Sequence, residues 1–168
     1  IDDILFVEQP QKALATLKKL EYELKRYDLS NELTVVYKHL KRFYLNKPEY
    51  FTYSKLYNQH VAYSLALDKA EDILGNYIKE YGYFFVMKDD KRAVKLKALF
   101  EEMLNVCALY QSHRMQVYRA AMEIIHRLHV DVRAFRNYDS KPIEDVIKDV
   151  EEIFDKYPRD SIYQHLQL

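Results

Sequence analysis

The chain almost lacks the two residues that most often interrupt regular structure. Its 168 residues include two glycines, Gly75 and Gly82, and four prolines, at positions 10, 48, 142 and 158. Glycine and proline mark most turns and strand connections, so a chain with so few of them is predicted to consist of helices joined by short polar segments. The first three prolines open stretches of periodic apolar residues, where proline is favoured as the first helical residue.

Apolar side chains recur at intervals of three and four residues, and this spacing places them on one face of each predicted helix. No segment alternates apolar and polar residues between turn signals, so no sheet is predicted. The expected fold class is therefore all-α, with about seven antiparallel helices joined by short segments. The predicted helices span residues 10–27, 30–45, 48–67, 68–87, 91–110, 112–132 and 142–156.

Several helix ends in this scheme depend on local signals. The apolar face of 68–87 passes through Gly82 without a change of phase, so the helix is expected to continue to Met87. The alternative is a helix that stops at Gly82, with residues 83–87 as a short apolar plug. Residues 91–132 lack glycine and proline and could form one helix of about 60 Å. Two antiparallel helices that turn near Gln111 and Ser112 bury their apolar faces better and are preferred. Candidate N-cap residues are Asp28 or Ser30, Asp68, Asp89 or Asp90, and Ser140.

Proline marks the entry to a first helix at positions 10 and 48, and a second predicted helix follows each entry. The next pair begins near Lys91, so the chain divides into units 10–45, 48–87 and 91–134. Periods of about 40 residues are typical of helical-hairpin repeats. The expected architecture is an α-solenoid of stacked hairpins, with a closed helical bundle as the alternative.

Residues 53–82, YSKLYNQHVAYSLALDKAEDILGNYIKEYG, show the most regular hairpin pattern. Ala70 stands early in the second predicted helix, where a small residue allows two helices to approach closely. The KAxxxL pattern of residues 69–74 also occurs at residues 12–17. This pattern resembles a tetratricopeptide (TPR) repeat. The resemblance implies a right-handed superhelix whose concave face binds peptides or protein partners.

One helical domain over residues 1–168 is the default expectation for a chain of this length, with a candidate sub-boundary at the linker-like residues 136–141. The formal net charge is zero, which argues against an overall electrostatic attraction to nucleic acid. The charge is unevenly spread, however. Residues 86–136 carry ten basic and six acidic side chains, whereas residues 137–168 carry four and eight.

Cys107 is the one cysteine and lies among apolar residues, so a buried thiol and no internal disulfide are expected. No apolar run approaches the roughly 20 residues needed to cross a bilayer, and no signal peptide is visible. These features favour a cytoplasmic protein without a membrane partner. Because the first residue is Ile1 rather than methionine, we expect a fragment of a longer chain.

The chain has 16 tyrosines, and several lie beside the apolar faces rather than on them. Tyrosine is common at binding hot spots because it offers a rigid ring and a hydrogen bond. We expect a non-catalytic interaction or scaffold module that binds a helix or an extended peptide of a protein partner on a concave face. The predicted partner-binding residues are Tyr50, Tyr53, Asn58, His60, Tyr63, Gln111 and His113.

Two alternative functions have some support in the sequence. Glu123, His126 and His129 form an E-x-x-H-x-x-H pattern, and di-iron carboxylate bundles use this i, i+3 spacing to bind metal. The chain has no second E-x-x-H, so a metal or small-molecule site in a helical bundle ranks below protein binding. The other alternative is a nucleic-acid-binding helical repeat with a basic strip. That strip comprises Lys88, Lys91, Arg92, Lys95, Lys97, Arg114, Arg119, Arg127, Arg133 and Arg136.

Motifs of the common enzyme classes are missing from the sequence. It contains no glycine-rich phosphate loop, no G-x-S-x-G, no C-x-x-C and no H-E-x-x-H. We therefore predict no catalytic residues, no enzymatic activity and no cofactor.

Overall fold

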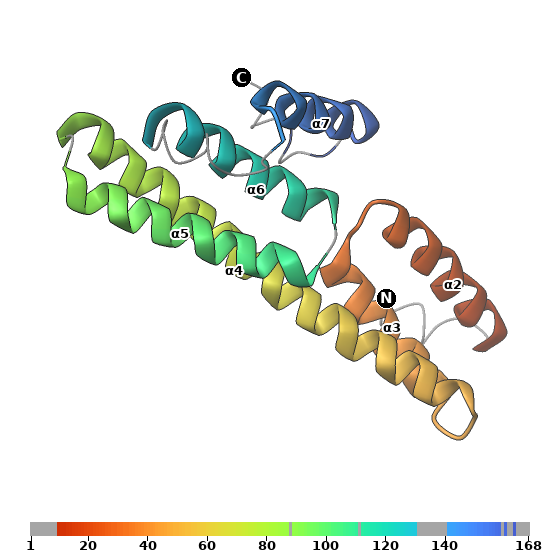
Figure 1. The fold of residues 1–168 in the computed structure, drawn as a ribbon. Coiled ribbons are helices and arrows are strands. Elements are labelled where there is room, and N and C mark those ends of the chain that lie inside the picture. The colour runs from red at the N-terminus through yellow and green to blue at the C-terminus, as the bar shows by residue number, and fades with distance from the viewer. Residues whose placement is uncertain are drawn as a thin grey trace. The chain divides into compact units, whose positions relative to one another are not determined.

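The computed structural model describes residues 10–87, 89–110, 112–130, 141–158, 160 and 163. Every regular element in this part of the chain is helical, which confirms the predicted all-α class there (Figure 1). None of the described helices combines the length and the hydropathy that a membrane crossing requires. In chain order the elements are α2 (Pro10–Arg26), α3 (Ser30–Phe43), α4 (Glu49–Met87), α5 (Asp90–Leu109), α6 (His113–Ile125), the π-helical turn η1 (His126–Val130) and α7 (Ile143–Lys156).

The chain divides into two compact units, residues 1–66 (unit 1) and residues 67–168 (unit 2), and the division falls within α4. Unit 1 contains α2, α3 and the first part of α4, and unit 2 contains the rest of α4 and all later elements. The predicted sub-boundary at 136–141 lies almost wholly outside the described residues.

The core of unit 1 is formed by the apolar helix faces that the spacing of apolar residues predicts. The helices α2 and α3 pack against each other, and Tyr53 of α4 joins their core. Burying a large apolar side chain stabilises a fold by about 1.5–3 kcal/mol, so this cluster is the main source of stability in the unit. The buried members of the cluster are Leu17, Leu33, Val36, Tyr37, Leu40 and Tyr53.

The turn before α3 differs from the prediction. The N-cap residue is Leu29, and no side chain caps the helix. The Ser30 Oγ instead lies 2.9 Å from His60 Nδ1, and the Asp28 carboxylate accepts a 2.8 Å hydrogen bond from the Tyr63 hydroxyl. Both predicted capping oxygens are therefore used in contacts with α4. Asp28 has a φ of 54°, a left-handed conformation that aspartate tolerates better than most residues.

The predicted joint at Asp68 is wrong, because α4 is one helix of 39 residues from Glu49 to Met87. Asp68 lies exposed on its surface. The surrounding residues 66–70 include no glycine or proline, and a continuing helix keeps every backbone group paired. Residues 48–87 are therefore not a hairpin, and the TPR resemblance lacks its two antiparallel helices over 53–82. The described residues contain six α-helices rather than about seven.

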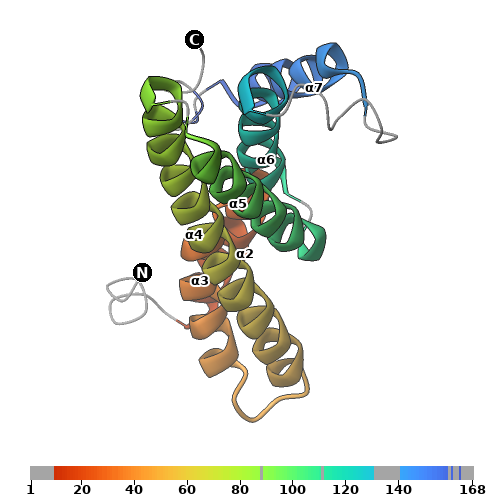
Figure 2. The same cartoon turned by 60° about the vertical axis from the view of Figure 1, so that its left-hand side comes forward.

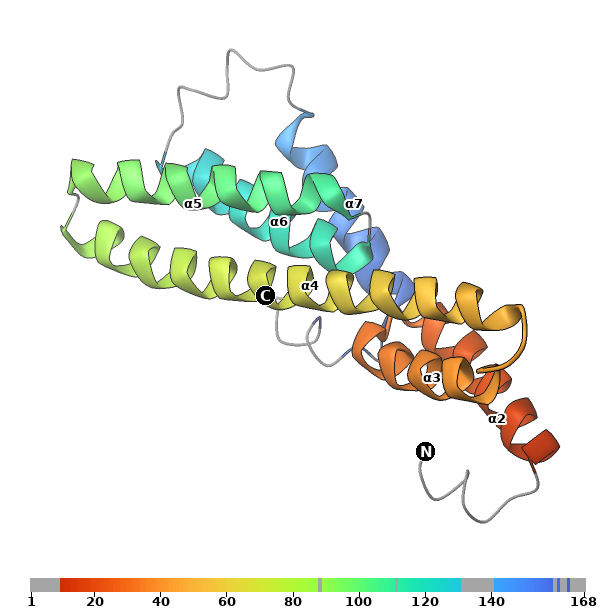
Figure 3. The ribbon, with the colours of Figure 1, turned by 90° about the horizontal axis from the view of Figure 1, so that it is seen from below.

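In unit 2, the later part of α4 lies alongside α5, and α6 packs against α5 (Figure 3). Ion pairs join α4 to α5, because Glu80 accepts hydrogen bonds from Arg92 at 2.7 Å and from Lys95 at 2.6 Å. The buried residues of these three helices form the core of the unit. They include Leu67, Ala70, Ile73, Leu74 and Tyr77 of α4, Leu96, Phe100 and Met103 of α5, and Met115, Val117, Tyr118 and Met122 of α6.

Two of the predicted helix starts in unit 2 are confirmed. The Asp89 side chain accepts a 3.0 Å hydrogen bond from the Lys91 amide and caps α5. The Ser112 hydroxyl accepts one of 3.2 Å from the Met115 amide and caps α6. The preference for two helices over residues 91–132 is thus correct. The N-cap of α7 is Pro142, and Ser140 lies outside the described residues.

Gly75 and Gly82 lie in α4 with helical backbones on an exposed face, and α4 continues through Gly82 to Met87 as expected. A Cβ added at either glycine meets no atom within 4 Å. Neither position has the positive φ that favours glycine. The fold therefore does not require glycine at either site.

We predict that Gly82→Ala raises the free energy of unfolding by about 0.5–1 kcal/mol, because alanine loses less backbone freedom on folding into a helix. Urea denaturation followed by circular dichroism measures the change. The exposed Ala98 of α5 offers the reverse control, since Ala98→Gly should lower the stability by a similar amount. A lower urea midpoint for Gly82→Ala would contradict a continuous helix at this position.

Candidate functional site

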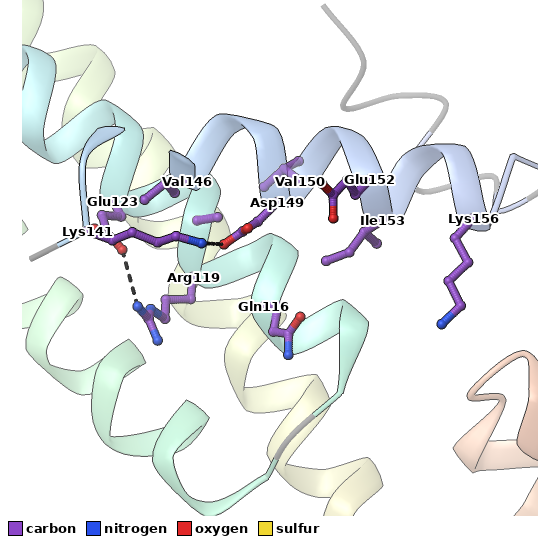
Figure 4. Close-up of a pocket in the computed structure, with 11 residues that line it drawn as sticks. Gln116, Arg119, Glu123, Lys141, Val146, Asp149, Val150, Glu152, Ile153 and Lys156 are labelled. Atoms are coloured by element: carbon purple, nitrogen blue, oxygen red, sulfur yellow. Dashed lines mark hydrogen bonds and ion pairs between the residues drawn. The ribbon is translucent and has the colours of Figure 1, made fainter. Parts of the chain in front are cut away.

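The candidate functional site is a groove of unit 2 between α6 and α7 (Figure 4). Its volume is about 590 Å³, within the range of cavities that hold ligands. Its lining from α6 consists of Gln116, Arg119, Ala120 and Glu123. These residues stand at positions i, i+3, i+4 and i+7, so one face of α6 forms this wall over about two turns, or 10 Å.

The opposite wall is the amphipathic helix α7. Val146, Asp149, Val150 and Ile153 line the groove at the same i, i+3, i+4 and i+7 spacing. The apolar residues of the lining are Ala120 of α6 with Val146, Val150 and Ile153 of α7.

The apolar face of α7 is incompletely covered by the rest of unit 2. The helix lies beside α6, and Val146 is its one buried residue (Figure 2). Val150 and Ile153, which line the groove, are half-buried. Ile147 lies outside the groove lining and is 39% exposed. An amphipathic helix normally directs such a stripe into a core. Part of the α7 stripe is therefore open to a further packing partner.

The charged residues that line the groove from α6 are one arginine, Arg119, and one carboxylate, Glu123. The buried carboxylate of Glu123 is shared by two guanidinium groups, from Arg127 at 3.1 Å and Arg119 at 3.5 Å. The Arg119 side chain is 51% exposed, whereas that of Arg127 is 13% exposed. Because Arg127 already balances the carboxylate, Arg119 presents a cation at the edge of the groove (Figure 4).

The α7 side of the groove contributes two carboxylates, Asp149 and Glu152, and two lysines, Lys141 and Lys156. Asp149 accepts a 2.5 Å hydrogen bond from Lys141, and this bond raises the pKa of the Lys141 ammonium group. Glu152 lines the groove one turn farther along and forms no ion pair with any described residue. Lys156 lies at the far end, with its Nζ 5.5 Å from the centroid of the Tyr157 ring. Each side of the groove thus combines acidic and basic side chains beside the apolar lining.

The residues predicted to bind a partner are not gathered on an open face. Tyr53 and Tyr63 are buried in unit 1, at 7% and 8% exposure, so the expectation that they line an accessible surface is wrong. Tyr50 and His60 are half-buried, Asn58 is exposed, and all of these residues belong to α4. A partner-binding role for Asn58 stays a prediction.

The other two predicted partner-binding residues belong to unit 2. His113 stacks on the Tyr157 ring, with centroids 3.9 Å apart, and its Nδ1 bonds to the Tyr163 hydroxyl. Its ring is therefore used in holding the segment after α7. Gln111 lies outside the described residues.

In unit 1, ion pairs and a hydrogen bond surround the buried carboxylate of Glu21. The Glu21 carboxylate lies 2.8 Å from Lys25 and 3.2 Å from Lys18, and it accepts a hydrogen bond from the Tyr37 hydroxyl. Burial alone would raise the pKa of Glu21, but the hydrogen bonds from Lys25 and Lys18 outweigh it and lower that pKa. These side chains form a structural network between helices.

His60 contacts this network through the ring of Tyr37. Its ring lies 5.2 Å from the Tyr37 ring, between centroids, and Nδ1 is bonded to Ser30. Burial lowers the pKa of His60, although the nearby Asp28 opposes that shift. The folded chain therefore favours the neutral imidazole.

The candidate metal ligands do not form a metal site. Glu123 is engaged by two arginines, and His126 Nδ1 lies 2.9 Å from the Tyr77 hydroxyl. The His126 ring also stacks on Phe100, whereas His129 is exposed. Among the described residues, no group of three or more histidine, cysteine or carboxylate side chains could hold a metal ion.

Half of the predicted basic strip is paired within the fold. Arg92 and Lys95 bind Glu80, Arg119 and Arg127 bind Glu123, and Arg114 binds Asp160 at 3.1 Å. Lys88, Arg133 and Arg136 lie outside the described residues or have no described side chain. Within the described part, these side chains do not form the row of uncommitted cations that a phosphate backbone would need.

The groove itself was missed by reasoning from the sequence. Its α7 wall could have been found, because Ile143, Val146, Ile147, Val150 and Ile153 make the clearest amphipathic pattern of the chain. The α6 wall gave no such signal, because Gln116, Arg119 and Glu123 read as an ordinary solvated helix face.

Comparison with known proteins finds no match for this chain among protein-family models, curated proteins or solved structures. Its function is therefore argued from the geometry and charge of the groove.

We predict that His60 makes unit 1 less stable in mild acid. Since burial lowers its folded-state pKa, the unfolded chain takes up a proton first, near pH 6.5. The stabilisation is fully present above about pH 6.5 and is lost as the pH falls through the folded-state pKa. Urea denaturation at intervals between pH 7.5 and pH 5 should show a smaller loss of stability for His60→Gln than for the unaltered chain.

The exposed His129 provides the control for this measurement. His129→Gln makes the same substitution at an exposed position and shows how much of any change comes from replacing a histidine by glutamine. If His60→Gln changes the pH dependence of stability no more than His129→Gln does, His60 is not held neutral by the fold.

Proposed function

We propose that this chain is a non-catalytic interaction module that binds an amphipathic helix of a protein partner in the α6–α7 groove. The observation that carries the proposal is the half-covered apolar stripe of α7, which lies beside a mostly polar face of α6 with the same residue spacing. A third helix in the slot would cover Val150 and Ile153, as a neighbouring helix does in a bundle.

The shape of the groove favours a helix over a compact small molecule. Both walls are helix faces that repeat every three and four residues, and such faces accept the side chains of a third helix as ridges into grooves. Peptide recognition by an amphipathic helix in an apolar groove is a common binding mode, with anchors at i, i+3, i+4 and i+7. Arg119 and Glu152 stand at the edges, where they would set orientation.

A binding role fits the polar clusters of the chain better than catalysis does. The pair that most resembles a nucleophile and its base is Ser30 and His60, 2.9 Å apart. Ser30 is 3% exposed, so a substrate carbonyl has no access to its Oγ. Asp28 accepts a hydrogen bond from Tyr63, which places it as a structural partner in this cluster.

The proposal keeps the helical-repeat interpretation for two helical hairpins only. Two hairpins, α2–α3 and α5–α6, have the helix lengths and short joints of repeat units. A TPR-like array would have to extend from these hairpins and not from residues 53–82.

Selection from a phage-displayed library tests this function. The library presents 18-residue helices with leucine fixed at i, i+3, i+4 and i+7 and all other positions varied. Enriched peptides, measured by fluorescence anisotropy, are expected to lose about tenfold in affinity with Val150→Ser, because the variant removes apolar contact worth about 1.4 kcal/mol.

The matched control is Ile147→Ser, which alters an exposed apolar side chain of the same helix outside the groove. That variant should bind the peptides as the unaltered chain does. Failure to enrich any peptide, or equal losses with the two variants, would refute the α6–α7 groove as a helix-binding site.

A further inference from the structure

The end of α4, where the chain turns into α5, carries apolar side chains that unit 2 leaves uncovered. The last three residues of the helix, Phe85, Val86 and Met87 (the α4 tip), are 66%, 79% and 64% exposed. In Figure 3 the end of α4 and the start of α5 meet at one extremity of unit 2. None of the three residues lines the α6–α7 groove, so the proposed function does not account for them.

The directions of these side chains restrict what can cover them. Successive residues of an α-helix point about 100° apart, so the three side chains of the α4 tip spread over about 200° around the helix axis. A partner helix contacts one face of such an end and leaves the other side chains in water. A lipid layer surrounds an inserted helix end on every side, and it therefore fits the α4 tip better than a protein surface does.

The charge around the α4 tip is positive. Residues 77–97, which comprise the last three turns of α4, the joint and the first two turns of α5, contain six basic and three acidic side chains. Arg92 and Lys95 share the carboxylate of Glu80, and this cluster retains one net positive charge. Internal pairing therefore does not cancel the excess of three positive charges.

The remaining charges of this segment act in the same sense. Lys79, Lys91 and Lys97 are exposed and form no ion pair with any described residue. The two aspartates, Asp89 and Asp90, stand at the start of α5, where the helix dipole offsets negative charge and Asp89 caps the helix. An excess of cations beside an apolar end favours a surface of anionic lipids, because each cation near such a surface raises the affinity about fivefold.

We propose that the α4 tip inserts into the headgroup region of an anionic membrane surface. Phe85, Val86 and Met87 contact lipid there, and the lysines remain at the level of the phosphates. Tyr83, one turn before the end of α4, is also exposed, and tyrosine rings are enriched at this depth. Such a contact needs no membrane-spanning helix. It corrects the expectation that the protein has no membrane partner, and it does not depend on the α6–α7 groove.

Tryptophan fluorescence tests the insertion, because the chain contains no tryptophan and a single introduced indole reports on one position. Phe85→Trp keeps an aromatic ring in the α4 tip. We expect its emission to shift to shorter wavelengths when phosphatidylcholine vesicles that contain phosphatidylserine are added. Leu109→Trp is the matched control, because it lies exposed at the opposite end of α5 and should show no shift.

Cosedimentation with the same vesicles measures the partition coefficient of the chain. Val86→Ser should lower it about 5- to 10-fold, because the variant removes the transfer of one valine side chain from water. Leu109→Ser should leave it unchanged. Vesicles without phosphatidylserine should bind the unaltered chain at least about fivefold more weakly.

The outcomes decide the proposal without reference to the groove. If Phe85→Trp shows no shift, or if both tryptophan variants shift equally, the α4 tip does not insert into lipid. Equal partition coefficients for Val86→Ser and the unaltered chain would also overturn the proposal. Either result leaves the peptide-binding test of the α6–α7 groove unaffected.

Discussion

Hydrogen bonds between buried tyrosine hydroxyls and polar groups on a neighbouring element fix the alignment of the elements within each unit. A tyrosine ring can enter a core at little cost only if its hydroxyl finds a partner, because an unpaired buried hydroxyl costs about 1–3 kcal/mol. Here the ring and the partner lie on different elements, so each bond fixes how far one slides along the other. The clearest pairs are Tyr63–Asp28 at 2.8 Å, Tyr118–Glu71 at 2.6 Å and Tyr77–His126 at 2.9 Å.

Of the three polar partners, His126 is buried, whereas Asp28 is half-buried and Glu71 is exposed. Burial raises the pKa of both Tyr77 and Tyr118, so each hydroxyl keeps its proton at neutral pH. The imidazole of His126 is then occupied by a structural contact in addition to its stacking on Phe100. A sequence pattern that suggested a metal ligand is thereby used to join η1 to α4.

Local signals were sufficient to predict most of the helices. The start of α5 follows from Asp89, which caps it as predicted, and α6 starts at the predicted turn near Gln111 and Ser112. The capping role of the Ser112 hydroxyl was not predicted. The same kind of signal failed at Asp68, because a capping residue can equally stay on the surface of a continuing helix. The choice between the two depends on what packs on either side of α4, and a single sequence does not contain that information.

The placement of side chains was less predictable than the placement of helices. Tyr53 and Tyr63 lie beside the main apolar stripe in sequence, which suggested exposure, yet both are buried because α4 is contacted over a wide face. The groove depends on the pairing of α6 with α7, whose facing stripes are some 30 residues apart in the chain. Periodicity identifies each stripe but not its neighbour.

The shared helix α4 has a thermodynamic consequence for the two units. Starting a helix is costly and extending it is not, so one nucleation event serves both halves of a 39-residue helix. A helix-breaking substitution near residues 66–67 would impose that initiation cost twice. The cooperativity of unfolding is thus greater than two separate hydrophobic cores would provide, and it is transmitted by an unbroken ladder of backbone hydrogen bonds.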